Sequence, residues 1–329
     1  MADGIAAFWS WWKTARSRVD RAIEAQELGD LADEITEKVR AIDPGLKWEL
    51  GGGEGKKHAF ALTWDGDIER RRTTERWLAG APAKDETWEY HPARPAGEGW
   101  EHLVMELGPH KVDFSGFTCT FEVDEARERV NACIFHPSLV KAPEHARGTA
   151  AFVMLDRAFG EDGVERWIGV IDLAKKKPEG ARPIADLVKA VTKLAASATG
   201  ERCALFQGTR DGAPIFIMKN EALKPIDHLD CDAQLAITIG LEAPTDEGLP
   251  SKKESVVIDA LEDALVADLD GHAAYHGRET CGGARTLYFF APRKGHAAEH
   301  VAKWKKKQKR RITITWTPDK KWEGLERWS

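Results

Sequence analysis

Hydrophobic residues recur every three or four positions after Pro250, which predicts an amphipathic helix in this segment. The apolar positions are Val257, Ile258, Leu261, Leu265 and Leu269. Ser251 and Glu254 have the spacing of a capping box, and Gly271 is suited to end the helix because glycine accepts a positive φ. The acidic residues of the segment, Glu262 among them, fall mainly on the opposite side of the helix.

Shorter patterns around this helix predict strands and a second helix. Gly282-Gly283 lies between two β-prone runs, and paired glycines suit the positive φ angles of a tight hairpin turn. Apolar residues near helical spacing predict a helix over 296–309. Strands are expected at 233–241, 272–280, 285–290 and 312–316. The resulting order, β-α-β-β-α-β, is that of the ferredoxin-like split motif.

The sequence of the N-terminal part predicts a second α+β module. Its first elements follow the order α-β-β-α-β, which is related to the order of the C-terminal elements. Its helices are expected at 1–28, 31–42, 68–78, 148–159 and 185–196. Its strands are expected at 46–50, 60–64, 87–90, 119–123, 130–135 and 167–173. Small and polar residues at 197–202 mark a boundary. We therefore expect an N-terminal module over residues 1–199 and a ferredoxin-like C-terminal domain over residues 200–329.

A set of spaced residues in the C-terminal part carries a resemblance to a known family. The set comprises Gly248-Leu249-Pro250, Ala260–Leu265, Gly277-Arg278, Gly283, Arg285 and Tyr288-Phe289-Phe290. These residues resemble a bacterial family catalogued as domain of unknown function 695, over roughly Arg202–Trp328. Members are sometimes fused to a domain similar to the regulator of ribonuclease E activity B, a small ferredoxin-like inhibitor. The resemblance implies a binding or regulatory role.

Composition and charge exclude several classes of protein. A length of 329 residues fits about two domains. The formal net charge of −6 is unlike the basic footprint of a nucleic-acid-binding protein, so no such partner is expected. No apolar run is long enough to span a bilayer, and the N-terminus lacks a secretory pattern. Five cysteines without a C-x-x-C motif favour the reducing cytoplasm over a disulfide framework or a cysteine zinc site.

The glycine-rich run Gly51–Lys57 resembles a phosphate-binding loop only in part. That loop needs four residues between its first glycine and Gly-Lys, then Ser or Thr for magnesium, then a helix. Here Gly51 is one residue too close to Gly55, Lys57 replaces the hydroxyl, and a strand follows. We therefore expect a hairpin loop and no nucleotide cofactor.

His296, Glu299 and His300 match H-x-x-E-H, an inverted zinc-peptidase pattern. Histidines four residues apart share a helix face, and the glutamate is placed to activate a zinc-bound water. The motif is short, however, and the sequence offers no third ligand. A solvated helix face without metal is the preferred interpretation, and a metal-dependent hydrolase is the alternative function.

Three further clusters are interpreted as structural. The aromatic run Phe8–Trp12 is expected to hold the first helix on a sheet rather than to anchor it in a membrane interface. The acidic residues of 156–165 are expected in a solvated turn, since they lack EF-hand spacing. The basic run Lys303–Arg311 is expected to be a solvated face, with Trp304 turned into the core.

The predicted hairpin provides the candidate binding residues. If Gly282-Gly283 is a two-residue loop, side-chain alternation places Arg278, Arg285, Leu287 and Phe289 on one face, together with His276. The opposite face, which lacks arginine, is expected to carry the helices. The arginine face is then left for the N-terminal module or for a partner, as an anion- or acid-seeking interface.

The sequence therefore predicts an uncharacterised cytoplasmic binding or regulatory protein that acts through an unknown protein partner. No catalytic residue, cofactor or metal is assigned. The alternatives are the hydrolase centred on His296 and an immunity-type protein that inhibits one partner. The sequence leaves the partner and the oligomeric state open.

Overall fold

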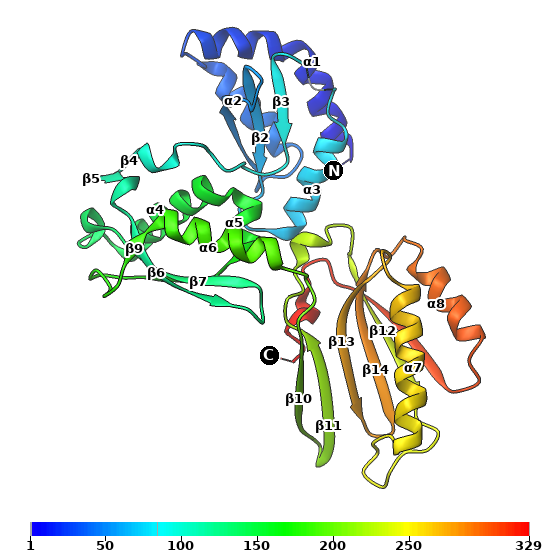
Figure 1. The fold of residues 1–329 in the computed structure, drawn as a ribbon. Helices are drawn as coiled ribbons and strands as arrows, with labels where there is room; N and C mark the ends of the chain where they lie inside the picture. Colours follow the sequence, from blue (N-terminus) through cyan, green and yellow to red (C-terminus); the bar gives the residue numbers. More distant parts are fainter. Residues whose placement is uncertain (1, 84, 329) are drawn as a thin grey trace. The chain divides into compact units, whose positions relative to one another are not determined.

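A computed structural model describes residues 2–83 and 85–328. The described chain is a mixed α+β protein with eight α-helices and several sheets, as the sequence predicts (Figure 1). Its residues group into two compact units. Unit 1 comprises Met1–Val123 and Arg129–Ala195, and unit 2 comprises Asp124–Glu128 and Ala196–Ser329.

Unit 1 opens with helices packed on a small three-stranded sheet. The helices are α1 (Ala2–Glu24), α2 (Asp30–Arg40) and α3 (Ile68–Ala79), and the strands are β1 (Lys47–Gly51), β2 (His58–Thr63) and β3 (Trp88–His91). The central strand β2 is antiparallel to β1 and parallel to β3. The buried rings of Phe8 and Trp12 in α1 lie 5.7 and 5.0 Å from the ring of Phe60 in β2. The N-terminal aromatics therefore hold the first helix on a sheet, and the glycine-rich run joins a hairpin, as predicted.

The remainder of unit 1 is a four-stranded sheet, a small hairpin and three helices. The elements are β4 (Val104–Leu107), β5 (His110–Asp113), β6 (Thr118–Asp124), β7 (Arg129–Phe135), α4 (Glu144–Phe159), α5 (Glu161–Trp167), β8 (Ile168–Leu173), β9 (Arg182–Pro183) and α6 (Ile184–Ser197). The sheet order is β8-β7-β6-β9, and β4 pairs with β5. Met154 of α4 and Leu187 of α6 share a hydrophobic core with Val130 and Ile134 of β7.

The acidic turn at α5 is not solvated, so that prediction is wrong. Glu161 is 7% exposed and accepts hydrogen bonds from the backbone N–H groups of Trp64, Asp65 and Arg94, at 3.1, 2.8 and 3.2 Å. Asp156 pairs with the guanidinium of Arg94. Burial raises the pKa of Glu161 to about 7, although the N–H donors favour its charged form. The carboxylate satisfies backbone groups distant in sequence, which a local pattern does not reveal.

Unit 2 is built on a six-stranded antiparallel sheet in the order β10-β11-β13-β14-β12-β15. The elements are β10 (Cys203–Arg210), β11 (Ala213–Asn220), β12 (Ala233–Gly240), α7 (Lys252–Asp268), β13 (Ala274–Cys281), β14 (Ala284–Ala291), α8 (Ala297–Lys306) and β15 (Ile312–Pro318). The Ser251 hydroxyl caps α7 by accepting from the Glu254 N–H, at 3.4 Å. The hairpin register is as predicted, with Cys281 opposite Ala284.

Helices α7 and α8 cover the face of the sheet that carries Leu287 and Phe289 (Figure 1). These two side chains are buried in one hydrophobic cluster with Ile258 of α7 and Val301 of α8. The sequence predicts the helices on the other face, and this is wrong. The arginines at the edge of this face do not exclude helices, because α7 supplies carboxylates that pair with them. Trp304 lies in the same cluster, as predicted.

The opposite face, predicted to carry helices, is covered by aromatic residues near the C-terminus. The ring of Phe290 stacks on Trp322 at a centroid distance of 3.9 Å, and Leu223 and Cys231 complete this smaller cluster. The Trp322 Nε1 group donates to the Cys231 carbonyl at 3.0 Å. Both faces of β14 are therefore apolar because each faces a core.

A β-bulge in β13 changes which side chains share a face. The register shifts between Tyr275 and Gly277, where Gly277 has a φ of 148°. His276 is the additional residue, so Tyr275 contacts Phe289 on the helix side and His276 contacts Phe290 on the other side. Side-chain alternation along the sequence instead predicts His276 on the face of Phe289 and Tyr275 on the face of Phe290. A bulge shifts alternation by one residue, and the glycine inside the strand, Gly277, is a local sign of it in the sequence.

Within residues 2–83 and 85–328, none of the helices combines the length and the apolar character needed to span a bilayer.

Candidate functional site

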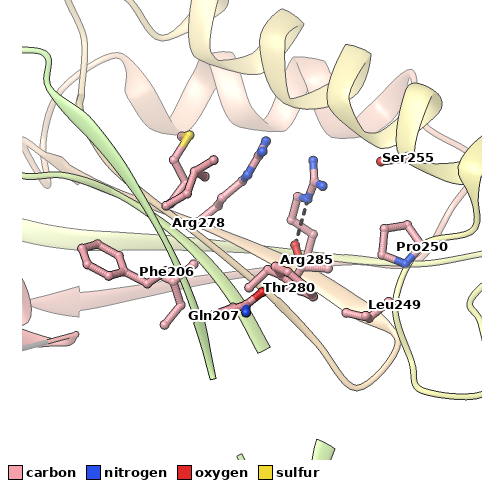
Figure 2. A pocket seen from close by; sticks show the side chains of 12 residues that line it. Phe206, Gln207, Leu249, Pro250, Ser255, Arg278, Thr280 and Arg285 are labelled. Atoms are coloured by element: carbon pink, nitrogen blue, oxygen red, sulfur yellow. Dashed lines mark hydrogen bonds between the residues drawn. The ribbon is translucent and has the colours of Figure 1, made fainter. Parts of the chain in front are cut away.

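Unit 2 contains a pocket of about 560 Å³ on the helix-bearing face of its sheet, beside the first turns of α7 (Figure 2). The apolar part of its lining is Leu205, Phe206, Phe216, Ile217, Met218, Leu249 and Pro250. Arg278 of β13 and Arg285 of β14 supply the charged groups. The pocket thus brings together residues from four strands, one loop and the start of one helix.

The β10–β11 hairpin forms the outer wall of this pocket. Strand β11 joins the sheet through four residue pairs, in which Phe216–Lys219 lie opposite Gly277–Thr280. The hairpin keeps large apolar side chains partly in solvent: Phe206 is 44% exposed and Phe216 is 46% exposed. Exposed aromatic side chains beside a hollow are typical of an interaction site. The sequence does not identify this hairpin as part of a site, because the pattern of residues in β10 and β11 does not show where the hairpin joins the sheet.

The loop before α7 forms the opposite wall and is held by backbone hydrogen bonds. The Gly248 carbonyl accepts from the Gly283 N–H at 2.8 Å, and the Gly283 carbonyl accepts from the Leu241 N–H at 2.9 Å. Gly248 has a φ of 76°, and a Cβ at this position would lie 2.9 Å from the Gly283 nitrogen. Only glycine accepts this angle and this close approach without strain. The hairpin turn therefore positions Leu249 and Pro250 at the pocket.

Two arginines and two carboxylates form a network at the inner end of the pocket. Arg278 Nη1 donates to Glu262 Oε2 at 2.5 Å. Arg285 Nη1 donates to Asp259 Oδ1 at 2.5 Å and to Glu262 Oε2 at 2.9 Å. Arg285 Nε also donates to the Thr280 hydroxyl at 3.1 Å. Glu262 is buried, whereas the sequence places it mainly on the solvent side of its helix.

The network is close to neutral and still has unused donors. Its two guanidinium groups face two carboxylates, so their charges balance. The Arg285 side chain is 5% exposed and the Arg278 side chain is 25% exposed. Burial opposes the charge of Arg278, but the Glu262 carboxylate outweighs this effect and raises the pKa of Arg278. Among the described residues, none accepts a hydrogen bond from Nε or Nη2 of Arg278. These groups are therefore available to a ligand at the pocket.

The structure separates the four predicted binding residues into two pairs. Arg278 and Arg285 line the pocket, whereas Leu287 and Phe289 are buried in the core beneath α7 and α8. The expectation that the N-terminal module or a partner covers Leu287 and Phe289 is therefore wrong, because α7 and α8 cover them. A direct contact of either side chain with a ligand requires the helices to move, so we confine the proposed site to the arginine pair and the pocket.

The residues of the H-x-x-E-H motif lie at the start of α8, away from the pocket residues. His296 and Glu299 are exposed, with His296 Nδ1 3.9 Å from Glu299 Oε2. His300 Nδ1 lies 3.3 Å from Asp268 Oδ1, and its ring lies 4.5 Å from the ring of His272. Across residues 2–83 and 85–328, no three metal-binding side chains converge on a point. That the motif binds no metal stays a prediction, tested below.

Residues 204–326 match a family model described as "Family of unknown function (DUF695)". The resemblance predicted from the sequence is confirmed for this C-terminal region. No curated protein and no solved structure matches the chain.

Proposed function

We propose that unit 2 is a non-catalytic binding module whose pocket takes an apolar ligand group bearing an oxygen acceptor. The pocket supports this proposal through one combination: large apolar side chains on two walls and unused Arg278 donors at the inner end. An apolar pocket with few polar groups that converge is the usual form of a ligand site. The apolar walls would supply affinity, and the guanidinium would orient the ligand.

The charge balance of the arginine network refines the chemistry of the proposed ligand. Glu262 and Asp259 already match both guanidinium charges, so a buried anion would meet little uncompensated positive charge. A neutral acceptor, such as a carbonyl, needs only the free N–H groups of Arg278. A partner protein that inserts an apolar side chain, with a backbone carbonyl beside it, satisfies both requirements. This ligand class replaces the acid-seeking interface as the working proposal.

The family resemblance and the pocket involve the same residues. Leu249, Pro250, Arg278 and Arg285 carry the resemblance to the family and also line the pocket. Glu262, which binds both arginines, belongs to the same set of residues. We infer that the pocket is the functional feature of this region.

We also infer a ferredoxin-like core within unit 2, and a cytoplasmic location. The four strands β13-β14-β12-β15 lie side by side in that order, and with α7 and α8 they follow the chain order β-α-β-β-α-β, which supports this topology. All five cysteines are free, which supports a reducing compartment. The unit is proposed to fold over residues 200–329.

Fluorescence titration with Nile red tests the pocket, because this neutral dye carries a carbonyl oxygen and brightens in apolar sites. The full chain should bind the dye saturably at one site. Met218→Trp should weaken binding by narrowing the pocket, and Arg278→Met should weaken it by removing the donors. Val170→Trp, at an exposed position of β8, is the matched control and should leave binding unchanged. Dye binding that Met218→Trp leaves intact would refute the proposed site.

A further inference from the structure

Strand β10 forms one edge of the six-stranded sheet of unit 2. It is eight residues long and almost entirely exposed, and Leu205 is the most exposed of the large hydrophobic side chains, at 78%. Within the described residues, β10 pairs with β11 on one side only. A long exposed edge strand presents unpaired N–H and C=O groups, which makes it a template for a further strand.

The antiparallel pairing shows which backbone groups of β10 point outward. The Arg202 carbonyl accepts a hydrogen bond from the Glu221 N–H at 2.9 Å. Along an antiparallel pair of strands, residue pairs that exchange hydrogen bonds alternate with pairs that do not. Thr209 and Pro214 then form a pair without hydrogen bonds between them, which agrees with the lack of an N–H group in proline. By this alternation Cys203, Leu205, Gln207 and Thr209 each direct one N–H and one C=O away from β11.

The usual protection of an edge strand is missing from β10. Natural edges are blocked by lysine, proline, bulges or inward charges. The sequence of β10, Cys203–Arg210, contains no lysine or proline, and its pairing with β11 has a continuous register. Its one charged residue, Arg210, is neutralised by Glu279, with Nη1–Oε1 and Nη2–Oε2 distances of 2.9 and 3.0 Å. An unprotected edge of this length therefore favours pairing with a further strand.

We propose that β10 pairs antiparallel with β10 of a second copy of this chain, about a two-fold axis at Gln207. In this register, the outward N–H and C=O groups of one β10 strand face those of the other. Leu205 then lies opposite Thr209 of the second copy. It also places Arg210 opposite Ala204 of the second copy and the two Arg210 side chains at opposite ends, so no like charges meet. A two-fold contact uses the same surface on both copies and closes the assembly as a dimer.

The occupant is a second copy because β10 matches itself in both hydrogen bonding and charge. Pairing joins two six-stranded sheets into one and covers the exposed Leu205 on each copy. A charged peptide would find no complementary charge along this edge, since Arg210 is already paired. Leu205 and Gln207 also line the pocket, but the two proposals have separate readouts: dye binding tests the pocket, and oligomeric state tests the strand edge.

Sedimentation velocity of the full chain over about a hundredfold concentration range tests the proposal, because a dimer responds to mass action. The wild-type chain should shift from monomer to dimer. Gln207→Pro removes an outward N–H without touching the β10–β11 ladder, and Leu205→Lys adds an edge charge. Each should weaken association at least tenfold. Val170→Lys, the same change as Leu205→Lys on the exposed strand β8, should dimerise like the wild type.

Hydrogen exchange on the wild-type chain provides a second readout that does not depend on whether the variants fold. Peptides covering β10 should exchange more slowly as the protein concentration rises, because pairing protects the outward amides of Leu205 and Gln207. A chain that stays monomeric at every concentration would overturn the proposal. So would a dimer that leaves β10 unprotected, or one that a folded Gln207→Pro variant forms with unchanged affinity.

Discussion

His276 should make unit 2 sensitive to acid, and His276→Leu should remove that sensitivity. The imidazole is fully buried, with its ring 5.6 Å from that of Phe290 and 4.7 Å from that of Trp328. Among the described residues, neither ring nitrogen has a hydrogen-bond partner. Burial, followed by the charges of Lys219 and Arg327, lowers the pKa of His276 to about 3.

The size of the effect follows from the difference between the folded and unfolded states. Unfolding restores the ordinary pKa of 6.5, so below this pH the unfolded chain binds a proton that the folded chain rejects until about pH 3. The contribution of His276 to stability is therefore complete above pH 6.5 and is lost as the pH falls towards 3. Since one pKa unit corresponds to about 1.4 kcal/mol, the loss reaches about 5 kcal/mol at most. Leucine also removes two unpaired nitrogens, whose burial costs about 1–3 kcal/mol.

Urea unfolding of the full chain at several pH values provides the assay. The free energy of unfolding of the wild type should fall more steeply below pH 6.5 than that of His276→Leu, and the gap should widen as the pH decreases. His300→Leu, the same change at a partly exposed histidine, is the matched control. Parallel pH curves for the wild type and His276→Leu would refute the reasoning.

Four further predictions concern the buried carboxylates, the C-terminal fragment and the histidine motif. Glu161 has a raised pKa of about 7, so its contribution is present below pH 4.5 and lost as the pH rises through 7. In thermal melts, wild-type unit 1 should therefore lose about 3 kcal/mol relative to Glu161→Gln over this range, and a constant difference would contradict this. The buried Glu128 carboxylate accepts from two backbone N–H groups and an arginine, so Glu128→Ala should destabilise unit 2 by about 3–5 kcal/mol in urea melts. The fragment 200–329 lacks Glu128 and should melt cooperatively but below the full chain; a non-cooperative melt with exposed dye-binding surface would argue against its independence. Replacing His296 and His300 with alanine should leave metal content unchanged and stability within about 1 kcal/mol, whereas stoichiometric zinc lost in the variant would establish a metal site.

Local signals in the sequence predict individual elements well. The Ser251 hydroxyl caps the start of α7, and Gly282-Gly283 forms the turn between β13 and β14. Both rest on interactions within a few residues, so a single sequence contains the information. The same reasoning places Trp304 in the core, where helical spacing aligns it with other apolar residues.

Features that depend on distant parts of the chain are not predicted. The bulge at His276 moves Tyr275 and His276 to the faces opposite those predicted, whereas Arg278 keeps its predicted face. The carboxylate of Glu161 is buried because it satisfies loops about 70 to 100 residues away. The pocket exists because β11 pairs with β13, and no local pattern specifies that pairing. Arg278 and Arg285 are identified from the sequence, but the apolar walls that make them a site are not.

The most direct test of the proposed binding function is a crystal structure of the full chain grown with Nile red. The proposed function predicts that the rings of the dye lie between Phe216, Met218 and Leu249, with its carbonyl oxygen within hydrogen-bond distance of Arg278 Nε or Nη2. A structure in which the β10–β11 hairpin closes onto α7 without the dye, or in which the dye binds elsewhere, would contradict it.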